Sequence, residues 1–201
     1  MTQLTNEFIL EKLKAKFGDE IVMFAGISHN IPALRGELSI GVRRSAIVDI
    51  CKFLRDDPDL QFNYLSDLCG ADMKNFSEGN PLGDDRVYRK AYLAVEHSDL
   101  PEPVPDEERF RVIYILTSLP NKYRIRLVVS VDGTKPVCPS ITSVYPAANW
   151  AEREAFDMYG IVFEGHPDLR RMYMPEDFEY YPLRKEFPLM GIPGSIPLPP
   201  K

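Results

Sequence analysis

The chain has 201 residues, of which 44% are hydrophobic and 27% charged, as is typical of a soluble globular protein of one domain or one domain with an appendage. Its net charge of −6 and the absence of a basic stripe argue against a nucleic-acid-binding protein. The longest apolar run, residues 21–27, is much shorter than the roughly 20 residues that a membrane-spanning helix needs. We therefore expect membrane association only through partners.

The motifs that bind redox and nucleotide cofactors are missing. Cys51, Cys69 and Cys138 form no Cys-x-x-Cys pair, which argues against a self-contained metal or iron–sulfur site and against a disulfide framework. A glycine pair at 36 and 41 has the spacing of a phosphate-binding loop, but the Lys-Ser/Thr that must follow it is absent. Residues 1–7 resemble neither a secretory signal nor an organellar targeting signal. We expect no cofactor in this chain.

Apolar periodicity in the first third of the chain predicts a helix, two strands, an amphipathic helix and a further strand. These elements are expected at residues 5–17, 21–28, 37–42, 43–54 and 60–65. Thr5 is the expected N-cap of the first helix. Cys51 lies on the apolar face of the second helix, which indicates a core residue rather than a reactive thiol. In the last strand, Leu60, Phe62 and Tyr64 should share one face.

The middle of the chain combines an irregular segment with a strong hairpin signal. Residues 69–108 are punctuated by glycine and proline at both ends and are interpreted as an insertion, in which 87–95 is a candidate strand. Residues 110–117 and 123–131 alternate and are joined by a short loop, which predicts an antiparallel hairpin. The expected fold is an α+β domain over 1–165, with a mixed, largely antiparallel sheet and a few helices.

A short helix is expected at 149–160. Asn149 as N-cap and Glu152 three residues later form a capping box, and Gly160 can end the helix. Trp150 shares a side of this helix with charged residues, so the helix is a candidate contact surface.

Residues 166–201 form a predicted extended tail. They contain eight of the 18 prolines, which exclude regular structure, together with aromatic residues that solvated linkers lack. The tail either wraps its own domain or lies along another protein. We favour the partner-binding interpretation, because so long an irregular segment is uncommon inside a compact domain.

Residues 152–172 read EREAFDMYGIVFEGHPDLRRM, and residues 182–188 read PLRKEFP. Both stretches closely resemble the diagnostic motif and the tail of the 30 kDa subunit family of NADH–quinone oxidoreductase (respiratory complex I), the C subunits of that enzyme. The hairpin and residues 139–146 fit the same family more loosely. Residues 69–108 are longer than is usual in that family.

The resemblance implies a core subunit of the peripheral arm that itself has no redox centre. FMN, the iron–sulfur clusters and quinone would be carried by partner subunits. The chief partner of this chain would be the large 49 kDa-type subunit that forms the quinone site. The complex would transfer electrons from NADH to quinone and translocate protons. The chain would lie at the cytoplasmic side of the bacterial cytoplasmic membrane, and in isolation it would be inactive.

The resemblance also carries a set of interface residues and implies no catalytic, cofactor-binding or metal-binding residue. The matched positions are Glu152, Arg153, Glu154, Asp157, Tyr159, Gly160, Gly165, His166, Pro167, Asp168, Arg170, Arg171, Pro182, Leu183, Arg184, Lys185, Phe187 and Pro188.

Several of these residues allow a second interpretation. Glu152, Glu154 and Asp157 could be an acid–base set, but capping and pairing with arginine explain them better. His166 could be a ligand, although a hydrogen-bonded turn is more usual. Arg170 and Arg171 could bind an anionic headgroup, but an ion pair such as Asp157–Arg171 is the better hypothesis.

Two other classes of protein stay open. The equivalent subunit of a membrane-bound hydrogenase-type complex would share the fold and part of the motif. A free-standing hydrolase would use the helix carboxylates and would be active without partners.

Overall fold

The computed structural model describes residues 4–22, 38–74 and 106–187. The main sheet has five strands in the order β1-β2-β5-β4-β3, and all neighbours are antiparallel except the parallel pair β2 and β5. The strands are β1 (Ile21–Val22), β2 (Leu38–Val42), β3 (Tyr64–Asp72), β4 (Phe110–Ser118) and β5 (Tyr123–Val131). A second, parallel pair is formed by β6 (Val137–Pro139) and β7 (Val162–Glu164). The predicted α+β class with a mixed, largely antiparallel sheet is confirmed.

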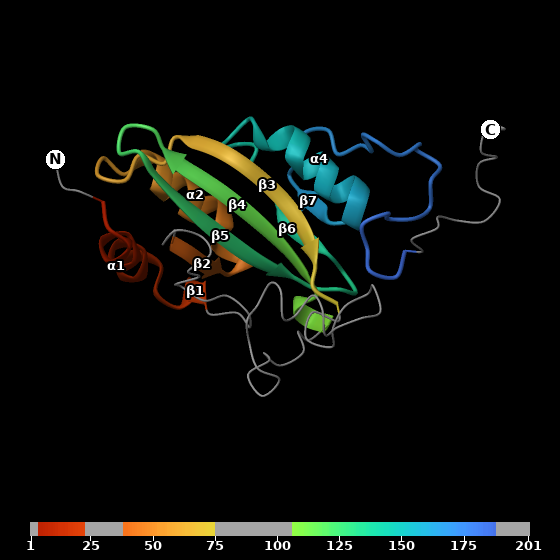
Figure 1. Ribbon diagram of the computed structural model, residues 1–201, viewed down its shortest axis with the longest axis horizontal. Helices are drawn as coiled ribbons and strands as arrows, with labels where there is room; N and C mark the ends of the chain where they lie inside the picture. The colour runs from red at the N-terminus through yellow and green to blue at the C-terminus, as the bar shows by residue number, and fades with distance from the viewer. Residues whose placement is uncertain (1–3, 23–37, 75–105, 188–201) are drawn as a thin grey trace, which may run out of the picture.

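Three α-helices accompany these strands in the described residues: α1 (Asn6–Phe17), α2 (Ile47–Asp56) and α4 (Ala148–Tyr159). Figure 1 shows α2 behind the sheet and α4 beside the edge strand β3. Short 3₁₀ turns lie at Gly18–Glu20, Arg44–Ala46 and Asp106–Glu108. The Thr5 cap is confirmed, because its Oγ1 accepts from the Phe8 N–H at 3.2 Å.

The core lies between the sheet and α2. The alternate residues of the hairpin that were expected to share a face are buried together: Phe110, Val112, Tyr114, Leu116, Ile125, Leu127, Val129 and Val131. Cys51 on α2 is fully buried, and burial raises the pKa of its thiol. Burial likewise raises the pKa of Cys138 to about 12. The interpretation of Cys51 as a core residue is therefore confirmed.

The predicted strand at 60–65 is wrong in its start and its face. Leu60 and Phe62 are buried, but Tyr64 is 51% exposed and begins β3. Gln61 has φ +48°, so the backbone does not continue the two-residue alternation of a strand through this point. A bulge between Leu65 and Asp67 shifts the register again.

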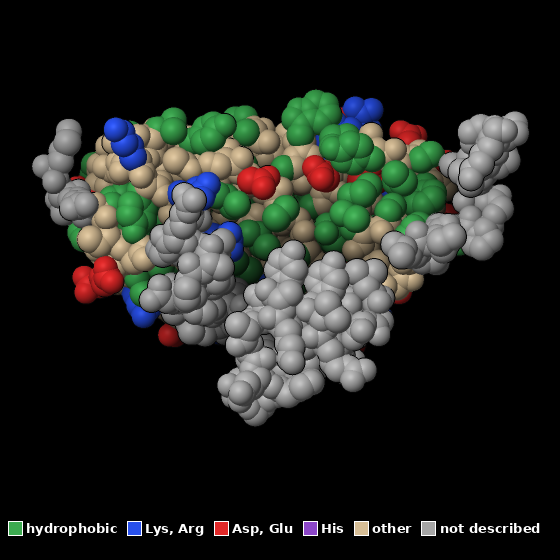
Figure 2. Space-filling model, viewed as in Figure 1, with side chains coloured by type: hydrophobic (Ala, Val, Ile, Leu, Met, Phe, Trp, Pro, Cys, Tyr) green, Lys and Arg blue, Asp and Glu red, His purple; other side chains and the backbone are tan. Residues whose placement is uncertain are grey.

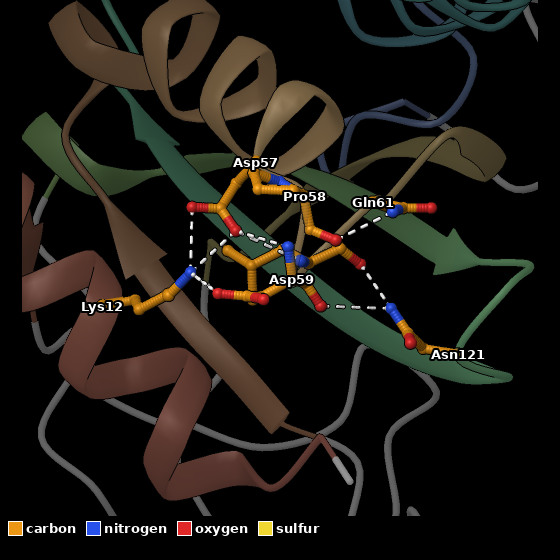
Figure 3. Close-up of polar contacts among 7 residues, drawn as sticks. Lys12, Asp57, Pro58, Asp59, Gln61 and Asn121 are labelled. Carbon is orange, nitrogen blue, oxygen red and sulfur yellow. Dashed lines mark hydrogen bonds and ion pairs between the residues drawn. The ribbon is translucent and has the colours of Figure 1, made fainter. Parts of the chain in front are cut away.

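A polar network holds the loop between α2 and β3 (Figure 3). The Lys12 ammonium lies 2.8 Å from an Asp57 carboxylate oxygen and 2.7 Å from one of Asp59. From the β4–β5 turn, the Asn121 amide donates to the carbonyl of Leu60 at 3.0 Å. The loop is thus tied to α1 on one side and to the hairpin on the other.

The irregular structure predicted from residue 69 onward is wrong for its first four residues, 69–72. Strand β3 continues to Asp72, with Cys69 opposite Ile113 and Gly70 opposite Val112. Gly70 packs directly against α4, because a Cβ at this position would lie 2.6 Å from the Tyr159 ring. Gly70 therefore marks close packing of α4 rather than a loop. The candidate strand at 87–95 and most of the predicted strand 21–28 lie outside the described residues.

Candidate functional site: the tail on helix α4

Helix α4 begins differently from the prediction. Its N-cap is Ala147, with no side-chain cap, so the Asn149–Glu152 capping box is wrong. Glu152 is instead fully buried and accepts hydrogen bonds from the Ser140 hydroxyl at 2.6 Å and the Ile141 N–H at 2.8 Å. These donors follow β6, so the carboxyl group binds the start of α4 to the preceding loop.

The C-terminal end of α4 is as predicted. Gly160 has φ +76°, and its N–H donates to the carbonyl of Phe156 at 2.8 Å. This is the left-handed cap that glycine provides without steric cost. A Cβ at this position would meet the Tyr181 ring and the Arg184 guanidinium, each at 2.6 Å. Gly160 thus also allows the tail to lie directly on the helix end.

Asp157 is the centre of the contact between tail and helix. Its side chain is fully buried. One oxygen accepts from the Arg171 guanidinium at 2.8 Å, and the other accepts from three consecutive backbone N–H groups, at residues 172, 173 and 174, at 2.9, 2.6 and 3.0 Å. Burial alone would raise the pKa of Asp157, but these four donors outweigh it and hold the pKa below its ordinary value. The hypothesised Asp157–Arg171 ion pair is confirmed.

Two more arginines extend this contact along the helix. Arg153 donates to the backbone carbonyls of Arg170 at 3.1 Å and Arg171 at 3.2 Å, and it lies over the Trp150 ring. Arg184 donates to the carbonyl of Tyr159 at 2.7 Å, which is one of the carbonyls left free at the end of a helix. Each guanidinium therefore joins α4 to the tail.

A second cluster joins the tail to the main sheet. Asp72, at the end of β3, has a fully buried side chain and accepts from Arg109 at 2.7 Å and from the Lys185 N–H at 2.9 Å. Arg109 also forms an ion pair with Glu186. Burial would raise the pKa of Asp72, but the hydrogen bonds from Arg109, Lys185 and Lys74 hold it below its ordinary value.

His166 forms a turn, as expected. Its Nδ1 accepts from the Asp168 N–H at 3.0 Å, so its Nε2 carries the proton and donates to the carbonyl of Asn149 at 3.1 Å. Gly165 before it has φ +82°. Asp168 and Arg170 form an exposed ion pair at 2.7 Å. These bonds hold the chain where it turns back along α4.

The remaining predicted positions are distributed around this contact. Tyr159 packs on Gly70, and the Leu183 N–H donates to the carbonyl of Met158 at 3.1 Å. Glu154 and Pro167 are exposed, Pro182 and Phe187 are half-buried, and Pro188 lies outside the described residues. Residues 166–187 thus lie along their own domain, which is the interpretation that was not favoured. Binding of the tail to another protein stays a prediction.

Sequence reasoning missed Asp72, Arg109 and Ser140. Their partners are separated from them by 113, 77 and 12 residues along the chain, respectively. No local pattern signals such pairs. The carboxylates of α4 do not form one acid–base set, because Glu152 faces the β6 loop, Asp157 faces the tail and Glu154 is exposed.

In the described ranges, no helix combines the length and the apolar composition that crossing a bilayer requires. Within the same ranges, no cluster of three or more His, Cys, Asp or Glu side chains is arranged to hold a metal ion.

Fold and site define a small α+β protein whose proline-rich C-terminal segment folds back over its last helix. The family model described as "Respiratory-chain NADH dehydrogenase, 30 Kd subunit" matches residues 40–193. The chain belongs to this family, which confirms the resemblance seen in the motif.

Individual relatives agree with the family. The C subunit of NADH-quinone oxidoreductase from Roseiflexus sp. (strain RS-1) is 43% identical over 186 residues, which cover 92% of this chain and 86% of that protein. The C 2 subunit of the same enzyme from Rhizobium meliloti (strain 1021) is 41% identical over 173 residues, or 86% of this chain and 78% of that protein. The homologous proteins are thus subunits of an oxidoreductase complex.

Solved structures are also similar to this chain, and two of them illustrate the likeness. A trypsin-resistant fragment (1–134) of Nqo5 matches with a TM-score of 0.51 and 30% identity over 81% of this chain and 98% of that chain. A chain of the membrane-bound sulfane sulfur reductase, an archaeal respiratory membrane complex, matches with a TM-score of 0.59 over 92% of this chain and 86% of that chain. At 17% identity, the second likeness concerns the fold alone.

A matched pair of glycine substitutions tests the contact between the tail and Gly160. We expect Gly160→Ala to lower the free energy of unfolding more than Gly165→Ala. Both residues have positive φ and share a backbone cost of about 1–2 kcal/mol, but only Gly160 has the tail within 4 Å of the added Cβ. Urea denaturation of the two variants measures the difference. Equal losses would show that the tail does not press on the helix end.

Proposed function

We propose that this chain is a core subunit without a redox centre in the peripheral arm of a proton-translocating NADH-quinone oxidoreductase. Its task is structural: it scaffolds the subunits that form the quinone site. Electrons would pass from NADH to quinone through FMN and iron–sulfur clusters held by partner subunits. The chain would reach the cytoplasmic side of the bacterial membrane only through the complex.

The observation that best supports this proposal is that Asp157 binds the tail to α4. A buried carboxylate with four donors and a lowered pKa holds a tail in place and is not free to exchange protons near neutral pH. The same helix, the strand β7 that follows it and the tail expose large apolar side chains. Five of the seven exposed large hydrophobic residues in the described ranges lie between positions 150 and 183: Trp150, Val162, Tyr173, Tyr180 and Leu183. Exposed aromatic residues are enriched at protein interfaces.

The partner is proposed to be the large 49 kDa-type quinone-site subunit. An apolar surface on a rigid helix and its attached tail suits a permanent contact, since obligate interfaces are more hydrophobic than transient ones. The alternative is the equivalent subunit of a hydrogenase-type complex, and the likeness to the sulfane sulfur reductase, which concerns the fold alone, does not favour it. We prefer NADH-quinone oxidoreductase because its subunits are the relatives at 41–43% identity.

The hydrolase alternative has less support. It needs two carboxylates that face one reaction site, whereas Glu152 and Asp157 are fully buried and bonded to different segments.

The isolated chain provides the direct test of the proposed role. We expect the purified protein to show no flavin or iron–sulfur absorbance and to oxidise no NADH, because all redox groups are assigned to partners. Visible spectroscopy after expression with flavin and iron supplied, together with an NADH oxidation assay, measures both. A stoichiometric chromophore or turnover by the pure chain would contradict the proposal.

A further inference from the structure

Two of the tail's arginines are turned toward the chain's own domain. Arg171 is only 11% exposed and is bound to Asp157, and the half-buried Arg184 is bound to the carbonyl of Tyr159. Both guanidinium groups also lie over the Tyr181 ring, at 5.1 and 4.3 Å from its centroid. These two cations therefore face the chain's own domain and contribute little to the outer surface.

Three of the tail's five acidic residues lie on its outer surface, whereas Glu186 pairs with Arg109 and Asp168 with Arg170. Glu176, Asp177 and Glu179 are exposed, and none of them forms an ion pair with another described residue. The exposed Arg170 is already engaged by Asp168. Although acidic and basic residues are balanced in the tail's composition, its outer surface at 176–179 is negative.

This acidic segment has an apolar anchor beneath it. The Phe178 ring packs against Tyr180 at 5.7 Å and Phe187 at 6.4 Å, and the Arg171 guanidinium lies 5.9 Å from its centroid. The Phe178 N–H donates to the carbonyl of Pro175 at 3.1 Å. The segment is therefore held before any partner arrives, which lowers the entropy lost on binding.

Aromatic residues flank the acidic residues on the outside. Tyr173 is 60% exposed and Tyr180 is 48% exposed. Figure 2 shows hydrophobic side chains gathered over α4 and the tail, at the end of the molecule away from α1. Tyrosine offers a large apolar contact and a polar tip at low entropic cost, and its ring also attracts cations. Acidic and aromatic groups together thus complement a surface rich in arginine or lysine.

We propose that the outer surface formed by Tyr173, Glu176, Asp177, Glu179 and Tyr180, here called the acidic–aromatic surface, docks on a positively charged surface of a neighbouring subunit. This inference rests on the proposed function, because it assumes a partner within the complex, and it adds the chemistry that the partner must present. The partner's cations pair with the three carboxylates and pack on the two tyrosine rings. Such complementary charges accelerate association and fix the orientation of the two surfaces.

Charge reversal in the full-length chain tests this surface. The test variant carries Glu176→Lys, Asp177→Lys and Glu179→Lys. The control carries Glu7→Lys, Glu11→Lys and Asp19→Lys, which makes the same change of charge on exposed residues at the α1 end. Each tagged chain replaces the natural copy in cells, and the subunits that co-purify from membranes are quantified by mass spectrometry at low and high salt.

We expect at least a tenfold loss of co-purifying NADH-quinone oxidoreductase subunits for the test variant and no loss for the control. Neutral variants, with Gln or Asn at the same three positions, should give intermediate recovery with weaker salt dependence. Equal recovery of the test variant and the control would overturn the inference. If the unmodified chain itself recovers no subunits of that complex, the proposed function fails. Thermal unfolding of the purified chains checks that both variants stay folded. The control should lose the more stability of the two, because Glu7→Lys reverses a charge in the first turn of α1.

Discussion

Replacing Asp157 by alanine should lower the free energy of unfolding by about 3–5 kcal/mol, which is the range for breaking a buried ion pair by removing one partner. The carboxylate is fully buried and binds Arg171 and three backbone N–H groups of the tail. Without it, a buried guanidinium and three donors lose their acceptor. Urea denaturation of the purified chain at neutral pH measures the loss.

Two further variants separate the ion pair from the backbone contacts. Arg171→Ala should cost less than Asp157→Ala, because the three N–H groups still satisfy the carboxylate. The double variant should cost less than the sum of the two, since the pair is lost only once. Glu154→Ala, on the exposed side of the same helix, is the control and should change stability by less than about 0.5 kcal/mol. A loss at Asp157 no larger than at Glu154 would refute the central role of this carboxylate.

The pH dependence of Asp157 has a defined sign. Its folded-state pKa is lowered, so its contribution is present above the unfolded pKa of about 3.9 and is lost as the pH falls through the folded value. Acid should therefore release the tail.

Glu152→Gln should remove a pH dependence of opposite sign. Burial raises the pKa of Glu152 from 4.5 to about 7, and the bonds from Ser140 and Ile141 only partly offset this. The folded chain therefore keeps a proton that the unfolded chain releases, and stability falls as the pH rises from about 4.5 through about 7. The pKa difference corresponds to about 3 kcal/mol over that window. Glutamine keeps an acceptor for Ile141 and carries no charge.

Unfolding measured at several pH values tests this directly. We expect the Glu152→Gln variant to be the more stable protein above pH 7 and to lose this advantage below pH 5. Glu154→Gln, with an exposed side chain, should follow the wild-type profile. Identical profiles for Glu152→Gln and the wild type would contradict a neutral buried Glu152.

The parts of the fold that sequence predicts well are governed by neighbours in the chain. The cap at Thr5, the apolar face of α2 and the alternation in β4 and β5 each depend on residues within a few positions, so the patterns are complete in the sequence. The Gly160 cap belongs to the same class, because positive φ at the end of a helix favours glycine whatever else is nearby.

The errors arise where a distant segment supplies the partner. Glu152 has the spacing of a capping box, but its carboxylate accepts hydrogen bonds from Ser140 and Ile141 in the loop after β6 instead. Cys69 and Gly70 look like the start of a loop, yet their pairing with β4 and the Tyr159 ring keeps them in the sheet. The prediction that Tyr64 shares the buried face of Leu60 and Phe62 is wrong because Gln61 has a left-handed backbone conformation. This conformation interrupts the alternation of apolar and polar residues that the sequence shows.

The candidate site shows the same division. The motif indicates which residues of α4 and the tail belong together, and the Asp157–Arg171 pair follows from it. The motif contains no information on which face of the tail is exposed, since five acidic and five basic residues over 167–201 look balanced until the fold turns Arg171 and Arg184 inward. The anchors at Asp72 and Arg109 lie far outside the motif and required the structure.

The most direct test of the account is to measure assembly and turnover separately in cells whose only copy of this chain carries Asp157→Ala. Native gel electrophoresis of the membranes gives the amount of assembled NADH-quinone oxidoreductase, and NADH:quinone activity is then normalised to that amount. We expect much less assembled complex, with unchanged activity in what remains. A complex that assembles fully but does not turn over would contradict it and would place Asp157 in the chemistry itself.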